Sequence, residues 1–408
     1  MSLNEEELYS TLLQLFYDYV ELHPTQISEP SFEEDMIDAV IELLILFSED
    51  EDEDYVYMIY DFVEIVLPFF YDSNIYTRRS YSGSIILPNL QPNHNITDKI
   101  TEQIKYLSTI PQPEQRTDEW YTFRNNLITA SNAYKIFESQ SQQNSLIYEK
   151  CISISNINSK DDSVFSNVNT ESTLHWGQKY EPLSVLFYEE IYNTKIGEFG
   201  CIKHRKYHFI GASPDGINID KSNERYGRIL EIKNIVNRDI TGIPKKEYWI
   251  QMQLQMETCD LNECDFLETR FIEYENELTF LSDSDSSLFT SRNGERKGII
   301  LYFHNNITGS PLYIYTPLNM SHSEYEKWSD TLIEEMITEN TELTWVRHIY
   351  WRLDEMSCIL VTRNQKWFND VVSIMSNFWD IIEKERITGY EHRAPIKRIP
   401  KTSLVTQI

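Results

Sequence analysis

The sequence predicts an α/β core preceded by an all-helical acidic module, and three observations support this fold class. Apolar side chains recur at helical spacing in residues 1–77, a segment with no Lys or Arg. From about residue 114, helix-like and strand-like segments follow each other as far as residue 274, which is typical of an α/β fold. The 408 residues are 41% hydrophobic and 13% aromatic, so the chain can bury a large core and lacks the composition of a disordered protein.

The acidic module, residues 1–77, is predicted to contain three helices, at 5–22, 32–47 and 55–70. It holds 20 Asp or Glu side chains and therefore carries most of the net charge of -29. This acidity could serve as a solvated face, as a surface for a partner or as a DNA-mimicking brake. The rest of the chain has 45 acidic against 36 basic side chains. The net charge therefore does not exclude a protein that handles a polyanion.

Three segments follow the module. Residues 78–112 are rich in Ser, Asn, Tyr and Pro and are predicted to form a linker with one short helix at 98–107. Residues 113–275 form the predicted core, in which two helices, a strand, a turn, a strand and a helix follow in order. Residues 276–385 extend this core after a polar stretch. Strands are expected there at 298–304 and 312–315, and helices at 321–339 and 364–385.

The last third of the chain carries aromatic and basic side chains that allow two interpretations each. The aromatic side chains could stack on unpaired bases, although packing into a helical core is the commoner fate of such residues. The tail, residues 386–408, is basic and contains Pro, and it could follow a phosphate backbone or be a solvated end. The aromatic residues concerned are Trp345, Trp351, Trp367, Phe368 and Trp379.

The strongest chemical signal is the string FIGASPDGIN followed by GRILEIKN. Asp215 lies at the end of one predicted strand, and Glu231 and Lys233 lie two residues apart on the next. Because side chains alternate across a strand, Glu231 and Lys233 point to the same side. If the two strands are hairpin neighbours, Asp215 meets Glu231, and two carboxylates that close form an oxygen-rich site for a hard cation.

This combination suits phosphodiester hydrolysis. That reaction needs Mg²⁺ or Mn²⁺ to polarise the phosphoryl oxygen, and a nearby ammonium to position the attacking water or help to deprotonate it. Taken alone, the E-x-K pattern is also compatible with the solvated face of an amphipathic strand. The S-P-D-G string, which places Asp215 sixteen residues before Glu231, makes the hydrolytic interpretation more specific.

Several other classes of protein are not supported. No run of eighteen uncharged apolar residues occurs and the N-terminus is acidic, so a soluble, intracellular protein without a membrane span is expected. The five cysteines are odd in number and widely spread, which favours reduced core thiols, and Cys259 and Cys264 form a poor zinc or iron–sulfur pattern. His175, His204 and His208 match no zinc spacing; each could be a ligand or a base, or could have an ordinary polar role.

Three further strings resemble segments of a known family. HWGQKYEP, with Glu181, is similar to the G-x-x-x-E helix segment of lambda-type exonucleases, and FRNNLITAS, residues 123–131, is similar to their R-x-x-x-I-T-A-S segment. YWIQMQLQM, residues 248–256, resembles the Q-x-Q helix that follows the E-x-K strand. The strings occur in the family's order over residues 119–259. The chain thus resembles the phage lambda exonuclease or YqaJ-like viral recombinase family of the PD-(D/E)XK nuclease superfamily, and its run RNQKWFNDVV is similar to members from large DNA viruses.

This resemblance implies a fold, an activity and partners. The fold would be restriction-endonuclease-like, with a central mixed β-sheet flanked by helices. The activity would be that of a metal-dependent exonuclease that uses one or two Mg²⁺ or Mn²⁺ ions, digests ends of double-stranded DNA 5′ to 3′ and leaves 3′ overhangs for strand annealing. The partners would be a single-strand annealing protein and further copies of the chain in a ring-shaped homo-oligomer, a trimer. Two alternatives stay open: an endonuclease of the same superfamily that cuts internally or at specific structures, and a non-catalytic DNA-binding protein.

The resemblance also assigns catalytic roles to residues. Asp215 and Glu231 would be direct metal ligands, together with the backbone carbonyl of Ile232. Glu181 would hold a second metal or its water, and Lys233 would orient the nucleophile.

A second group of residues would bind the 5′ phosphate of the DNA end. These are Arg124, Ser131, Ser213 and Gln251, with Thr129 and Gln253 as further candidates. A guanidinium fork with two hydroxyls suits a terminal phosphate dianion irrespective of the family. Gln251 and Gln253 can also be read as polar positions on an amphipathic helix.

Overall fold

The computed structural model describes most of the chain. The described residues are 5–23, 32–48, 53–73, 94–111, 113, 117–152, 169–170, 172–284, 287–318 and 320–395. The first part of the predicted linker and most of the predicted basic tail lie outside this description. Among the described helices, none has the length and apolar character needed to span a membrane.

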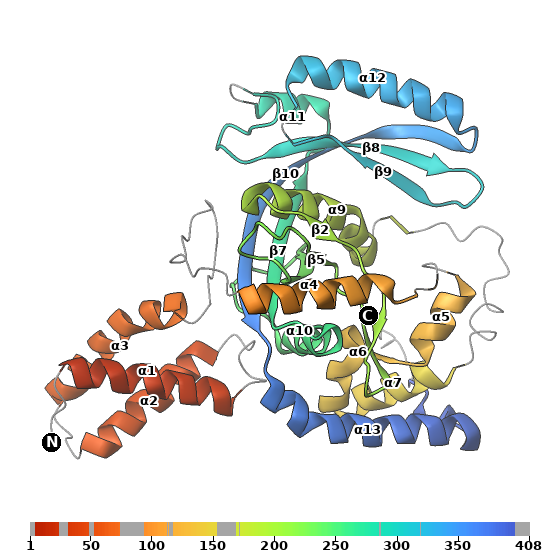
Figure 1. The fold of residues 1–408 in the computed structure, drawn as a ribbon. Coiled ribbons are helices and arrows are strands. Elements are labelled where there is room, and N and C mark those ends of the chain that lie inside the picture. The colour runs from red at the N-terminus through yellow and green to blue at the C-terminus, as the bar shows by residue number, and fades with distance from the viewer. Residues whose placement is uncertain are drawn as a thin grey trace, which may run out of the picture.

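The three helices predicted in the acidic module are confirmed. They are α1 (Glu5–Leu22), α2 (Phe32–Ser48) and α3 (Glu53–Ser73), drawn in red and orange in Figure 1. Each contributes one apolar stripe to a common core, in which Leu12, Met36 and Ile59 are fully buried. The acidic side chains whose exposure the structure describes, such as Glu34, Asp38 and Asp61, lie on the outer faces, so the module has a hydrophobic core of its own.

The helix predicted at 98–107 is also confirmed, as the longer α4 (His94–Thr109). It is attached to the core by side-chain contacts. Gln103 Nε2 donates a hydrogen bond to the carbonyl oxygen of Cys259, and the hydroxyls of Thr101 and Tyr226 are 3.1 Å apart. Gly227, in the left-handed region with φ of 84°, allows Ile100 to approach its backbone closely.

The centre of the molecule is a mixed seven-stranded sheet with the strand order β2-β5-β6-β7-β10-β8-β9. β6 and β7 are parallel and the other neighbours are antiparallel, which confirms the predicted central mixed sheet. A smaller sheet has the order β1-β4-β3. The strands are β1 (Ile128–Thr129), β2 (Ile196–Gly197), β3 (Ile202–Lys203), β4 (Ile210–Ala212), β5 (Gly216–Asn218), β6 (Ile229–Asn234), β7 (Glu263–Glu273), β8 (Lys297–Asn305), β9 (Pro311–Tyr315) and β10 (Leu343–Thr362).

Helices cover the sheet, as predicted. Leu230 and Ile232 of β6 pack with Tyr188 of α9, whereas Ile229 packs in the cluster that contains Met252 of α10. Alternate residues of β6 therefore face different helices. The helices of this part are α5 (Asp118–Asn125), α6 (Ala130–Ala133), α7 (Gln140–Cys151), α9 (Thr173–Tyr192), α10 (Lys246–Cys259), α11 (Glu277–Ser282), α12 (His322–Glu339) and α13 (Gln365–Thr388), with 3₁₀ turns at Tyr134–Phe137 and Glu391–Arg393.

The extension after residue 275 contains every element predicted for it and two that were not. The strands predicted at 298–304 and 312–315 are β8 and β9, and the predicted helices are α12 and α13. The two elements that were not predicted are the short helix α11 and the long strand β10. The first half of β10 pairs with β8 and its second half with β7, so strands from both sides of residue 275 share one sheet. Figure 1 shows β10 running from the α12 layer to the start of α13.

The aromatic and thiol side chains are largely core residues. Trp351, Trp367, Phe368 and Trp379 are buried, whereas Trp345 is half-buried, so packing accounts for most of this set. All five cysteines are buried and free, which confirms the core-thiol interpretation.

Candidate active site

The position of Asp215 follows from the unequal lengths of two neighbouring strands. β5 pairs with β6 only at Gly216↔Leu230 and Ile217↔Ile229, and β6 continues to Asn234. The Asp215 carboxylate lies just before β5 begins, beside the part of β6 with which β5 does not pair, and its Oδ2 accepts a hydrogen bond of 2.6 Å from the backbone N–H of Ile232. Asp215 thus lies next to the strand of Glu231, as expected. The strand that precedes Asp215, β4, belongs to the smaller sheet, however, and the hairpin neighbour of β6 is β5.

The turn at this point depends on a glycine. A Cβ atom on Gly216 would lie 2.1 Å from Cγ2 of Ile196 on the neighbouring strand β2. Two residues of the S-P-D-G string therefore have separate roles: Gly216 permits the close contact between β5 and β2, and Asp215 places its carboxylate next to β6.

Glu231 and Lys233 lie on one side of β6, as the strand alternation predicts. Lys233 Nζ donates to Glu231 Oε1 and, at 3.3 Å, to Gln251 Oε1 of α10. It also lies 4.9 Å from the centre of the Tyr248 ring. Glu231 is fully buried, so its carboxylate depends on these protein partners for compensation.

Gln255 is a further member of the site that sequence reasoning missed. Its Nε2 donates to Glu231 Oε2 at 2.6 Å and to the Ser213 carbonyl oxygen at 3.3 Å. The signal for it is its spacing, since Gln251 and Gln255 are four apart and so lie on one face of α10. Gln253 points elsewhere: its amide donates to the Thr362 carbonyl oxygen and accepts from the Asn364 N–H.

Three carboxylates influence one another at this place. Burial raises the pKa of Asp215 well above its ordinary value, and the charges of Glu231 and Glu181 raise it further. Desolvation and then the charge of Glu231 raise the pKa of Glu181, which projects from α9. Burial lowers the pKa of Lys233, but attraction to Glu231 and Asp215 outweighs this effect and the net pKa is raised. Lys233 is therefore an ammonium ion at neutral pH.

These residues fit a divalent cation. With all three carboxylates ionised and Lys233 protonated, the group carries two excess negative charges, which one Mg²⁺ or Mn²⁺ would balance. The donors are carboxylate oxygens, which such hard ions prefer. Within the described residues, no three His, Cys, Asp or Glu side chains are already gathered closely enough to hold a metal. The Lys233–Glu231 contact occupies a carboxylate oxygen that an ion would use.

Some of the predicted phosphate-binding residues lie near the carboxylates and Lys233. Arg124, in the last turn of α5, donates a hydrogen bond of 3.2 Å from Nη1 to the Ser213 hydroxyl. Gln255 contacts both the Ser213 carbonyl oxygen and Glu231, so the Arg124–Ser213 pair lies near the carboxylates. The hydroxyls of Thr129 and Ser131 are 3.5 Å apart at the start of α6, and Gln251 contacts Lys233.

Two basic side chains that were not predicted support α5. Lys150 Nζ donates to the Arg124 carbonyl oxygen at 3.2 Å, and Arg386 donates to the Asn125 carbonyl oxygen at 2.8 Å. Burial lowers the pKa of Lys150 to about 8. Both cations lie at the carboxyl end of the helix, where positive charge is favourable, so they fix the backbone that carries Arg124.

Two of the histidines have partners away from Asp215, Glu231 and Glu181. His175 Nε2 is 2.6 Å from the Tyr313 hydroxyl, and His204 Nδ1 accepts from the backbone N–H groups of Lys206 and Tyr207. His208 is exposed after the end of β3. These contacts favour ordinary polar roles for His175 and His204.

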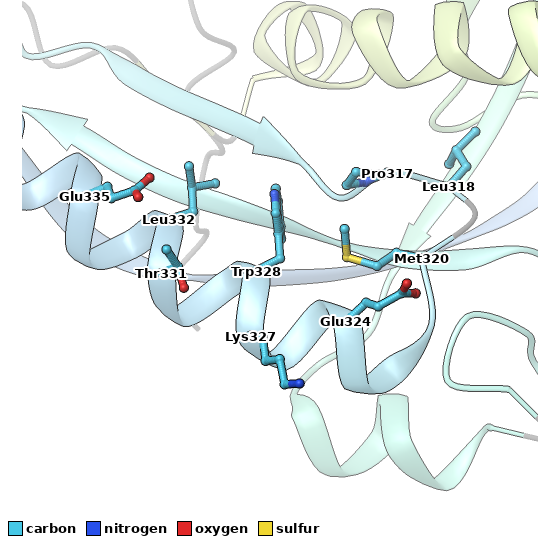
Figure 2. Close-up of a pocket in the computed structure, with 9 residues that line it drawn as sticks. All are labelled: Pro317, Leu318, Met320, Glu324, Lys327, Trp328, Thr331, Leu332 and Glu335. Atoms are coloured by element: carbon cyan, nitrogen blue, oxygen red, sulfur yellow. The ribbon is translucent and has the colours of Figure 1, made fainter.

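A separate groove with a volume of about 790 Å³ lies between α12 and the loop that follows β9, and Figure 2 shows the side chains that line it. Its floor is apolar, with Leu318, Met320 and Trp328, and Glu324 and Glu335 lie among its lining residues. The groove includes none of the residues predicted for the metal or phosphate sites.

Three comparisons show known proteins to which this chain is similar. Residues 119–262 match the YqaJ-like viral recombinase domain. An uncharacterized protein of Acanthamoeba polyphaga mimivirus is 29% identical over 309 residues, which cover 69% of this chain and 54% of that protein. The chain thus spans about half the length of this relative, and the expected likeness to proteins of large DNA viruses is confirmed.

Two solved structures are also similar, at lower sequence identity. The alkaline exonuclease LHK-Exo from Laribacter hongkongensis is 18% identical with a TM-score of 0.39, over 66% of this chain and 94% of that one. The same enzyme in complex with dAMP is 19% identical with a TM-score of 0.38 over the same shares. All residues of the candidate site lie within residues 119–262, the segment that matches the YqaJ-like viral recombinase domain.

Proposed function

We propose that this chain is a metal-dependent DNA exonuclease that degrades duplex ends 5′ to 3′ and leaves 3′ overhangs for recombination or repair by strand annealing. One observation carries the proposal. The carboxylates Asp215 and Glu231, with Lys233, lie beside the Arg124–Ser213 pair. A candidate cation site for phosphodiester hydrolysis and a candidate site for a terminal phosphate would thus be neighbours in one part of the chain.

The metal site would be formed by Asp215, Glu231, Glu181 and the carbonyl of Ile232. One or two Mg²⁺ or Mn²⁺ ions held there would polarise the phosphoryl oxygen and lower the pKa of a water. Lys233, kept protonated by its carboxylate neighbours, would stabilise developing negative charge and orient the water. Gln255 would hold Glu231 in place through its second carboxylate oxygen.

The end specificity would come from the phosphate-binding residues. A terminal phosphate is a dianion, and the planar guanidinium of Arg124 can donate two parallel hydrogen bonds to it. Ser213 already accepts from Arg124, and its hydroxyl would turn to the phosphate. Ser131, exposed at the start of α6, and the amide of Gln251 would complete the pocket. The annealing-protein partner and the ring-shaped trimer implied by the resemblance belong to the same proposal.

Digestion of linear and closed circular duplexes with Mg²⁺ tests the proposal directly. We expect linear DNA to be degraded from its ends and covalently closed circles to stay intact, with no cleavage when EDTA removes the metal. A strand labelled at its 5′ end should release the label early, and a 3′ label should persist. Nicking of closed circles would contradict the exonuclease and favour the endonuclease of the same superfamily.

The role of the carboxylates is tested by Asp215→Asn. We expect the rate of digestion to fall by at least about a hundredfold, because the substitution removes a charged metal ligand. Asp239→Asn is the matched control, since Asp239 is exposed, and it should digest DNA at the parent rate. If Asp215→Asn retained the parent rate, the assigned metal site would be wrong. If the parent protein bound DNA without cutting it, the alternative of a non-catalytic DNA-binding protein would be favoured.

A further inference from the structure

The loop between β3 and β4 is strongly basic in an acidic chain. Residues 203–208 read Lys-His-Arg-Lys-Tyr-His, and Lys203, Arg205 and Lys206 are exposed. Within the described part of the chain, none of these three cations has a carboxylate oxygen within 4.0 Å, whereas cations such as Arg228 and Arg363 are paired. We call Lys203, Arg205 and Lys206 the basic turn. Its charge is left available for a negatively charged partner.

The backbone of the basic turn is fixed by a buried histidine. His204 Nδ1 accepts hydrogen bonds of 3.0 Å from the backbone N–H groups of both Lys206 and Tyr207. The His204 ring is stacked on Phe368 of α13, with ring centres 5.7 Å apart and an interplanar angle of 11°. The cations are therefore carried by an ordered loop, so that little entropy is lost when they bind a partner.

Side chains of α4 and of the turn itself orient two of the cations. The Arg205 guanidinium lies 3.8 Å from the centre of the Tyr106 ring and donates to Gln103 Oε1 at 2.9 Å. Lys206 Nζ lies 4.8 Å from the centre of the Tyr207 ring. Tyr106 is 40% exposed, so an aromatic face accompanies the positive charge at the surface. Cations interleaved with aromatic rings are suited to the phosphates and sugars of a nucleic acid.

We propose that the basic turn binds the phosphate backbone of the DNA whose end occupies the candidate active site. This inference rests on the proposed function. β4 connects the two places directly, because it leads from the turn to Ser213 and Asp215. The eight steps along the chain from Tyr207 to Asp215 span at most about 28 Å when fully extended. One DNA molecule therefore reaches both places within about eight base-pair steps of about 3.4 Å each.

A backbone contact of this kind suits an enzyme that must accept every sequence. Phosphate contacts position DNA without reading bases, and they let a protein slide along it. The rival partner is the acidic module of the same chain, which has no Lys or Arg in residues 1–77. Such a partner would compete with DNA, whereas the proposed contact contributes to DNA binding.

The triple variant K203A/R205A/K206A separates these outcomes. The probe is a 5′-phosphorylated, fluorescent 20-base-pair duplex, and its anisotropy is measured with full-length protein in EDTA between 50 and 300 mM NaCl. Each phosphate contact contributes about 0.9 to the slope of log K against log salt. We expect the slope to lose up to about 2.7 in magnitude and affinity at the lowest salt to fall at least about tenfold. Lys203→Ala alone should remove about 0.9.

The control variant K221A/R292A/R347A removes the same number of positive charges from exposed positions elsewhere. It should keep the parent slope. Equal slopes for the parent and K203A/R205A/K206A, with folding verified by circular dichroism, would overturn the inference. Tighter DNA binding by that variant would show that the basic turn binds the acidic module in place of DNA. A parent that degrades DNA ends while the turn variant keeps its slope would refute the turn contact alone. A parent that does not bind DNA would refute the proposed function.

Discussion

At the scale of single residues, the site is held together by hydrogen bonds between side chains and backbone groups of different elements. Asp215 accepts from the Ile232 N–H, Glu231 accepts from Lys233 and Gln255, and Arg124 donates to Ser213. These contacts join β6, α5, α10 and the turn before β5. A change at any one of them should therefore have a consequence that can be separated from loss of the fold.

Gln255→Leu tests the support of Glu231. The substitution removes the donor to a fully buried carboxylate oxygen while keeping a similar side-chain volume. We expect the rate to fall by about 10–100-fold and the Mg²⁺ concentration for half-maximal rate to rise, because the partner that orients a metal ligand is lost. Gln253→Leu is the control on the same helix. It loses contacts to Thr362 and Asn364 and should change stability, with no change in the Mg²⁺ dependence. An unaltered Mg²⁺ dependence in Gln255→Leu would show that its contact is structural.

Arg124→Ala tests end recognition. A guanidinium bound to a phosphate contributes about 1.5–3 kcal/mol, which corresponds to a factor of about 10–150. We expect the variant to lose the preference of kcat/KM for 5′-phosphorylated over 5′-hydroxyl ends by this factor, measured on otherwise identical duplexes. Arg292→Ala, at an exposed position, should keep the preference. An equal loss of activity on both kinds of end would argue against a phosphate-specific role.

Much of the site could be predicted at this scale because its strings are local. The E-x-K spacing on one strand and the S-P-D-G turn before the neighbouring strand already place Glu231, Lys233 and Asp215 together. Gln255 was not found because its role depends on which face of α10 meets β6. Gln253 could not be judged because its partners lie more than one hundred residues later in the sequence.

At the scale of elements, β10 joins the two halves of the sheet. Its fully buried Trp351 packs edge-on against Phe187 and Phe271, and it lies so close to Gly298 that an added Cβ would be 2.4 Å from its ring. Sequence patterning did not reveal this strand for a physical reason. The register shifts between Trp345 and Arg347 and again between Leu353 and Glu355, so the alternation of inward and outward side chains is broken twice.

Trp351→Ala should therefore destabilise the sheet strongly. Removing a fully buried aromatic side chain costs about 3–5 kcal/mol in the free energy of unfolding, which urea denaturation followed by intrinsic fluorescence and circular dichroism would detect. Val346→Ala, at a 43% exposed position of the same strand, is the control and should cost little. Similar unfolding midpoints for the two variants would contradict the role of β10 as the connection between the halves.

At the scale of the whole molecule, the chain combines an acidic helical module with an α/β part built around one large sheet. The composition of residues 1–77 predicted the module, and its helices and separate core agree with that prediction. The sheet shared across residue 275 could not be predicted, since it depends on pairs between β7 and β10 that are far apart in sequence, from about eighty positions for Trp351↔Glu273 to about one hundred for Thr362↔Glu263. Among the described residues, the hydrogen bonds that hold Asp215 and Glu231 come from β6 and α10 and not from the acidic module.

The charge of the module gives the last prediction. Residues 1–77 carry 20 acidic and no Lys or Arg side chains, so folding brings like charges together without compensation. Salt screens this repulsion, with a Debye length that falls from about 30 Å at 0.01 M to about 8 Å at 0.15 M. We expect two thermal transitions by calorimetry, of which the one assigned to the module rises by several degrees between 10 and 150 mM NaCl while the other stays nearly constant. A chain lacking residues 1–77 should lose only the salt-sensitive transition. A single transition with no salt dependence would show that the module and the sheet unfold together.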